Sequence, residues 1–85
     1  MKIEKLAEDR YRIHDGNRGL EFDKERYEDL FYAVPVDSTA FYRLLTEAVC
    51  ETEEERKTMV SMIEALPDMD SGLKALMDEI AALGV

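Results

Sequence analysis

The sequence contains one cysteine, one histidine and no long run of apolar residues. Cys50 alone cannot form an intramolecular disulfide, which suits a reducing cytosol and is compatible with other compartments. No segment approaches the roughly 20 apolar residues that a membrane-spanning helix requires, and the first residues interleave charges with apolar side chains instead of forming a signal-type core. We therefore expect a cytoplasmic protein without a membrane segment.

Positive charge is also scarce, because 11 Lys and Arg residues face 20 Asp and Glu residues, for a net charge of −9. Residues 1–35 carry seven basic and nine acidic residues, whereas residues 36–85 carry four and eleven, which gives −2 and −7. A field of that sign repels phosphate backbones and attracts basic surfaces. Direct nucleic-acid binding is therefore disfavoured, and a basic protein partner is one interpretation. The other is that the charge keeps a small protein in solution.

The sequence contains no recognisable catalytic or metal-binding motif. Cys50 would need an orienting base to act as a nucleophile, and the sole candidate, His14, lies on the charged face of a predicted strand. Asp68, Asp70 and Glu79 partly follow the spacing of a calcium-binding loop. However, Leu73 stands where that loop requires glycine, and the helical pattern continues through the segment. We predict no enzyme, no metal site and no cofactor.

Residues 10–34 form the clearest structural unit in the sequence. Tyr11 and Ile13 alternate with charged residues, as do Leu20 and Phe22, which is the period of half-buried strands. The segment between them, residues 15–19, contains two glycines and an asparagine, residues that tolerate positive φ. The pattern predicts a tight antiparallel hairpin.

A helix follows directly after the hairpin. Asp23 can accept hydrogen bonds from the free N–H groups of the first turn, and Phe22 can pack against Tyr27 as a hydrophobic staple. The apolar stripe has helical spacing and comprises Tyr27, Leu30, Phe31 and Val34. Because Pro35 cannot continue the helix, the sequence predicts a helix over residues 24–34.

Residues 1–9 admit two interpretations. Ile3, Leu6 and Ala7 have helical spacing, but a strand here would add a third strand to the hairpin. A two-stranded hairpin alone is marginal in water, so we favour the strand. The sequence thus predicts a small antiparallel sheet of two or three strands within residues 2–22.

The second half of the chain predicts three further amphipathic helices, over residues 39–50, 53–66 and 69–83. Asp37 and Ser38 are candidate caps for the first of these, and Thr52 with Glu55 has the form of a capping box for the second. No Gly or Pro separates the first two helices, so one long bent helix is the alternative. The predicted fold class is α+β, as a single compact domain over residues 1–85.

Six residues are candidates for binding a partner. The densest anionic run lies at the start of a predicted helix, where the helix dipole favours anions. Two tyrosines lie beside the apolar stripes of their helices, and half-exposed tyrosines are enriched at interfaces. Four methionines on the last two helices, at positions 59, 62, 69 and 77, suit either a core or an adaptable binding face, and we favour the core. The six candidates are Glu51, Glu53, Glu54, Glu55, Tyr32 and Tyr42.

By size and charge alone, the chain is similar to small acidic proteins, many of them phage-encoded, that inhibit nucleic-acid-handling machinery by occupying basic surfaces. The leading hypothesis is a non-enzymatic protein-binding module, an inhibitor or regulator that imitates nucleic acid and docks on a basic partner. The alternative is a structural subunit that self-associates, as a weak homodimer at most, through an apolar face of the last helix. That face comprises Leu73, Leu76, Met77, Ile80 and Leu83.

Overall fold

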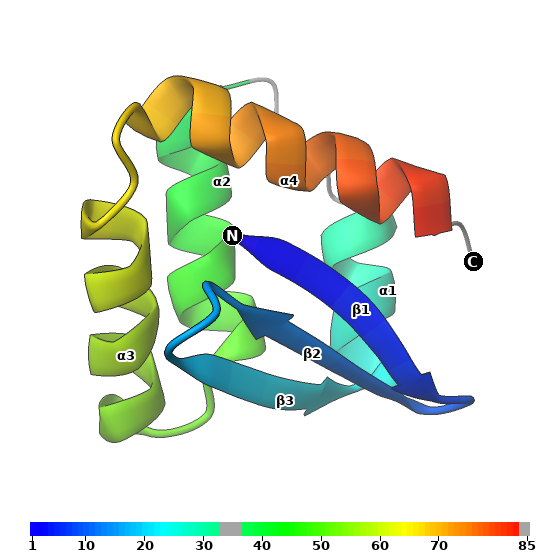
Figure 1. Ribbon diagram of the computed structural model, residues 1–85. Helices are drawn as coiled ribbons and strands as arrows, with labels where there is room; N and C mark the ends of the chain where they lie inside the picture. Colours follow the sequence, from blue (N-terminus) through cyan, green and yellow to red (C-terminus); the bar gives the residue numbers. More distant parts are fainter. Residues whose placement is uncertain (33–36, 84–85) are drawn as a thin grey trace.

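The computed structural model describes residues 1–32 and 37–83, which form a three-stranded antiparallel sheet followed by helices (Figure 1). This confirms the predicted α+β class. The elements are β1 (Lys2–Ala7), β2 (Arg10–His14), β3 (Gly19–Asp23), α1 (Lys24–Tyr32), α2 (Ser38–Leu44), the π-helical turn η1 (Leu45–Val49), α3 (Glu53–Glu64) and α4 (Met69–Leu83). The predicted end of the first helix, at Val34 and Pro35, lies outside the described residues.

The sheet has the order β1-β2-β3, so the preference for a strand within residues 1–9 is confirmed. Its register aligns Ile3 with Ile13 and Ile13 with Leu20, and these three side chains are buried on one face. The opposite face carries charged residues, including Arg12 opposite Glu21. Period-two alternation therefore places apolar residues on the face that the helices cover.

The β2–β3 hairpin closes through Asp15. Its carboxylate accepts hydrogen bonds from the backbone N–H groups of Asn17 (3.0 Å) and Arg18 (2.8 Å). Gly16 alone among the described residues has positive φ, at 97°. Gly19 lies in a crowded position, because a Cβ there would lie 2.9 Å from His14 Cβ and 2.8 Å from Arg12 Nε, so neighbouring side chains would have to shift. The hairpin prediction is confirmed, although Asn17 does not adopt positive φ.

Helix α1 begins as predicted, with Asp23 Oδ1 accepting a hydrogen bond from the Arg26 N–H at 3.0 Å. The Tyr11 ring stacks on Tyr27, with centroids 3.9 Å apart, and more distantly on Phe22, at 6.2 Å. The Tyr27 hydroxyl donates a hydrogen bond to the carbonyl of Ile80 in α4, at 3.0 Å. Tyr27 therefore links the sheet, α1 and α4.

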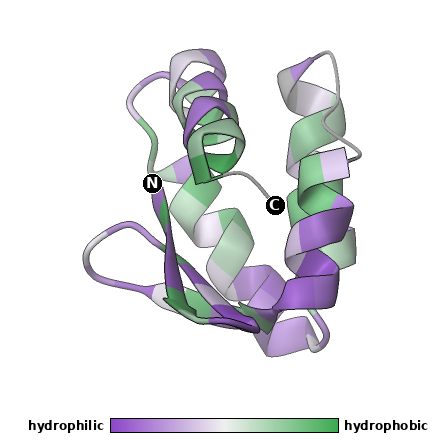
Figure 2. Cartoon of the chain, turned by 90° about the vertical axis from the view of Figure 1, so that its right-hand side faces the viewer, coloured by the Kyte–Doolittle hydropathy of each residue, from purple (hydrophilic) through white to green (hydrophobic). Residues whose placement is uncertain are grey.

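The helices pack against the apolar face of the sheet and enclose one core (Figure 1). Apolar residues alternate with hydrophilic ones along the strands and helices (Figure 2). Among the described residues, eleven core side chains are essentially inaccessible to solvent: Ile13, Tyr27, Leu30, Phe41, Leu45, Met59, Met62, Ile63, Leu73, Leu76 and Ile80. Of the four helical methionines, Met59 and Met62 belong to this core, whereas Met69 is exposed.

The second and third predicted helices are separate. The chain is helical through α2 and η1, leaves the helix at Cys50 (φ −89°, ψ 128°) and enters α3 through Thr52. Asp37 caps α2 by accepting from the Ala40 N–H at 2.8 Å. In the π-helical turn, the Thr46 hydroxyl donates to backbone carbonyls of the preceding turn. A single bent helix is therefore excluded, because the chain is extended between η1 and α3.

Candidate partner-binding surface

The acidic run begins at the N-terminus of α3, where the predicted capping box forms. Thr52 Oγ1 accepts a hydrogen bond from the Glu55 N–H at 3.1 Å, and Glu55 Oε1 accepts from the Thr52 N–H at 3.1 Å. The same Oε1 also accepts from the Glu51 N–H at 3.0 Å. Glu55 is half-buried and fixes the start of the helix. Its carboxylate is therefore turned back onto the chain, away from a partner.

Glu51 and Glu53 each lie near a cation. Glu51 Oε1 is 3.1 Å from Arg26 Nε, and Glu53 Oε2 is 4.0 Å from Arg56 Nη1. Their side chains are 60% and 77% exposed, and exposed pairs of this kind contribute only ~0–1 kcal/mol. Glu53 can exchange its long contact for a partner at little cost, whereas Glu51 is paired with Arg26, whose side chain is only 31% exposed.

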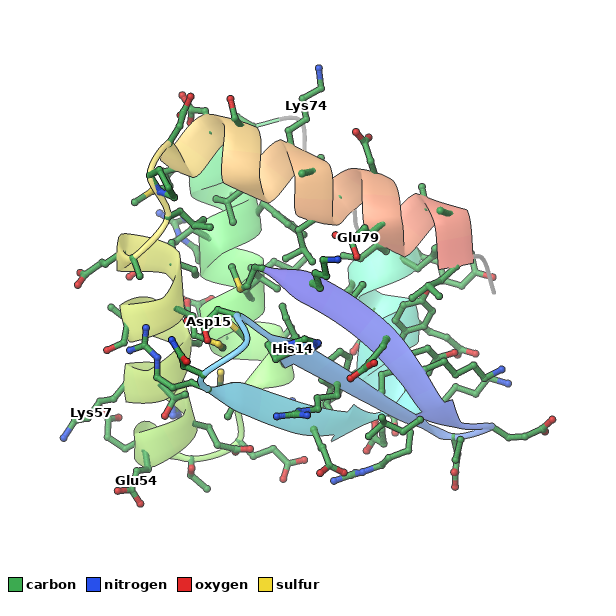
Figure 3. The ribbon with its side chains drawn as sticks, in the orientation of Figure 1. His14, Asp15, Glu54, Lys57, Lys74 and Glu79 are labelled. Carbon is green, nitrogen blue, oxygen red and sulfur yellow. The ribbon has the colours of Figure 1, made fainter. Side chains whose placement is uncertain are left out.

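Glu54 is the freest carboxylate of the run. Within the part of the chain that the structure describes, its side chain makes no ion pair or hydrogen bond, and only its backbone carbonyl accepts, from the Thr58 hydroxyl. In Figure 3 the side chain points away from the molecule at the lower end of α3. Glu53 and Glu54 therefore form the outward part of the acidic run.

A second acidic surface lies next to Glu51 and was not predicted. Asp23, Glu25, Asp29 and Glu51 line a hollow of about 370 Å³ together with Arg26. Arg26 is held in place by Glu51 and by a hydrogen bond that it donates to the carbonyl of Ala48. The i, i+4 spacing of Glu25 and Asp29 is visible in the sequence. Their proximity to Glu51 arises only from the packing of α1 against η1.

The two candidate tyrosines lie in different surroundings. Tyr42 is half-buried and lines a hollow of about 550 Å³ that Glu53 also lines, so it adjoins the acidic run. Tyr32 is 73% exposed at the end of α1, packed edge-on against Phe31 with centroids 5.2 Å apart. The structure therefore places Tyr42 beside Glu53 of the acidic run.

His14 and Cys50, the two residues considered for catalysis, each contact a neighbouring group of the fold. His14 Nε2 lies 3.5 Å from Glu4 Oε1 on the outer face of the sheet. Cys50 is buried, and its thiol donates to the Leu45 carbonyl at 3.5 Å. Burial, reinforced by the nearby Glu55 carboxylate, raises the pKa of the Cys50 thiol to about 11. A nucleophilic cysteine needs the opposite shift, because the thiolate is the reactive form.

Within residues 1–32 and 37–83, no group of three or more His, Cys, Asp or Glu side chains is arranged to hold a metal ion. Across the same residues, no helix combines the length and the apolar character needed to cross a membrane. Comparison with known proteins found no matching family model, no similar curated protein and no similar solved structure.

Proposed function

We propose that this chain is a non-enzymatic binding module that docks on a basic surface of a nucleic-acid-handling protein and thereby inhibits or regulates it. The observation that supports this is the pair of outward carboxylates at the start of α3. Glu54 is unpaired within the described residues, and Glu53 is 77% exposed with only a long contact to Arg56. The half-buried Tyr42 lines a hollow together with Glu53, and Glu51 lines the neighbouring acidic hollow with the carboxylates of α1.

The physical basis is electrostatic imitation of a phosphate backbone. A partner that binds phosphates presents Lys and Arg side chains, and a solvated run of carboxylates offers them charges of the same sign. Such charges steer association over the screening distance, which is ~10 Å at 0.1 M salt. Tyr42 supplies apolar contact area beside the charges. The acidic run would set the rate of association, and the tyrosine would slow dissociation.

Affinity capture with paired charge variants tests the proposal. The tagged chain is expressed in cells, and bound proteins are quantified by mass spectrometry at about 0.05 M and about 0.3 M salt, because steering weakens as salt screens the charges. The test variant is Glu53→Lys/Glu54→Lys. The matched control is Glu47→Lys/Asp78→Lys, which changes the net charge equally at exposed positions of η1 and α4.

We expect the wild-type chain and the control to enrich the same basic protein, and the test variant to lose it. Purified partner is then tested for binding to a labelled nucleic acid, which the wild-type chain should displace. Equal capture by the test variant and the wild type would remove Glu53 and Glu54 from the mechanism. Equal loss in both double variants would show that net charge alone, with no particular surface, governs binding.

The alternative of self-association through α4 gains no support from burial. Leu73, Leu76 and Ile80 have no exposed surface because they are already in the core. Met77 is half-buried, and the large apolar side chains of α4 that remain exposed are Met69 and Leu83, each at 42%, at opposite ends of the helix. Most of the predicted face is therefore used in the core.

A further inference from the structure

The outward face of α3 carries a pattern of charges that complements itself. Lys57, Val60, Ser61 and Glu64 recur at helical spacing i, i+3, i+4 and i+7, on the side opposite the buried methionines. Lys57, Ser61 and Glu64 are exposed, and Val60 is half-buried. The face therefore has a cation and, two turns away, a carboxylate, with small or apolar side chains between them. The exposed Glu53, one turn before Lys57, adds a carboxylate to the N-terminal end of this face.

Neither charge is satisfied within the described part of the chain. The side chains of Lys57 and Glu64 make no ion pair and no hydrogen bond there, and Lys57 points away from the molecule in Figure 3. Arg56 is the contrasting case, since it lies 4.0 Å from Glu53. Lys57 and Glu64 thus present one free positive and one free negative charge.

Two hollows lie beside this face. Lys57 and Val60 line the hollow of about 550 Å³, and Glu64 and Met69 line a second hollow of about 310 Å³. Tyr42 borders both hollows. The hollows offer room for side chains of a helix laid against α3, with Val60 and Tyr42 as apolar contacts and Lys57 and Glu64 as charges.

We propose that this face binds the α3 helix of a second copy of the chain, antiparallel and related by a two-fold axis. The midpoint between positions 57 and 64 is also the midpoint between positions 60 and 61. A two-fold axis there brings Lys57 opposite Glu64 of the second copy, and Glu64 opposite its Lys57. Val60 then meets Ser61 of the second copy, and the small serine permits close helix approach. The self-complementary charge pattern is what selects a second copy over another occupant.

Electrostatic repulsion between the two copies and the weakness of exposed ion pairs keep this dimer weak. Each chain carries a net charge of −9, so two copies repel each other. The two new ion pairs are exposed and therefore contribute little, so apolar contact at Val60 and Tyr42 must supply the rest of the binding free energy. The inference does not rest on the proposed function, because it concerns Lys57 and Glu64 and requires no other partner.

Sedimentation equilibrium from about 10 µM to about 1 mM tests the proposal, because weak dimers populate in that range. We expect the wild-type chain to approach a dimer at the upper end. Lys57→Glu and Glu64→Lys should each weaken association about tenfold, because both ion pairs become repulsive. The controls Lys74→Glu and Asp78→Lys change net charge by the same amounts at exposed positions on α4 and should leave the wild-type equilibrium within about twofold, since α4 is not at the interface.

Mixing the two single variants gives the sharpest result. Lys57→Glu presents carboxylates at both ends, and Glu64→Lys presents cations at both ends, so an equimolar mixture should form a heterodimer with two restored ion pairs. Native mass spectrometry distinguishes this heterodimer from either homodimer. A wild-type chain that stays monomeric at about 1 mM would overturn the proposal. So would a mixture that associates no better than its separate components, or a control that weakens the dimer as much as the test variants.

Discussion

Asp15 shows at the residue scale how one side chain closes the hairpin. Its carboxylate accepts the backbone N–H groups of Arg18 and Asn17, and it lies 3.1 Å from the Arg18 guanidinium. These contacts favour the charged form, so they hold the pKa of Asp15 at about 2, with the Arg18 backbone hydrogen bond the largest cause. The sequence predicted a turn here, although it did not show that the aspartate would be the residue that organises it.

The lowered pKa predicts how stability depends on pH. The folded pKa of about 2 lies below the ordinary value of 3.8, so the contribution of Asp15 is fully present above about pH 4 and is lost as pH falls through about 2. We expect Asp15→Ala to lower the free energy of unfolding at pH 6 by more than it does at pH 2. Urea denaturation at both pH values measures this difference. An equal cost at the two pH values would show that the carboxylate charge does not stabilise the turn.

At the element scale, helix α1 combines a cap that the local sequence encodes with a hydrogen bond that depends on the tertiary structure. The Asp23 cap was predicted from the sequence and forms, whereas the Tyr27 hydroxyl bond to the Ile80 carbonyl depends on where α4 lies. Likewise, the capping box at Thr52 was predicted, but the π-helical turn before it was not. Caps involve neighbours three residues apart, so the sequence contains them.

The cap and the core of α1 should differ in their contributions to stability. Asp23→Ala removes one N-terminal hydrogen bond and should cost about 0.5 to 2 kcal/mol. Leu30→Ala leaves a cavity at a residue with no exposed surface and should cost about 2 to 5 kcal/mol. The exposed Asp29→Ala serves as the control and should stay within about 0.5 kcal/mol of wild type. Guanidinium melts that rank Leu30→Ala with the control would contradict this placement of α1.

At the scale of the whole molecule, the excess of negative charge is the dominant electrostatic feature. The ion pairs within the described residues are few and exposed or partly exposed, so they offset little of the repulsion among the 20 carboxylates. Repulsion of this kind acts over the screening distance and destabilises the compact state. The fold is therefore expected to gain stability when salt screens it.

Thermal melts measure that gain. We expect the wild-type melting temperature to rise by about 2 to 4 °C between about 0.05 M and about 0.5 M NaCl. This shift corresponds to an increase of roughly 0.5 kcal/mol in the free energy of unfolding when salt screens the repulsion. Glu47→Lys/Asp78→Lys reduces the net charge from −9 to −5, because each reversal adds two positive charges, and should show a smaller rise. A melting temperature that falls with salt would show instead that the surface ion pairs outweigh the general repulsion.

The sequence by itself determined the α+β class, the β2–β3 hairpin, the N-terminal caps of α1, α2 and α3, and the buried alternation along β2 and β3. Each depends on a period or on contacts between near neighbours, and both can be read along the chain. It also indicated the acidic run at the start of α3, and the strand at residues 2–7 was favoured over a helix.

Tertiary structure decided where Glu51 lies relative to the rest of the molecule. The packing of α1 against η1 brings Glu51 to Arg26 and to the carboxylates of α1. The tertiary structure also placed Tyr42 beside α3, and it used most of the apolar face of α4 in the core. These outcomes depend on contacts between residues far apart in the sequence, so no local pattern contains them.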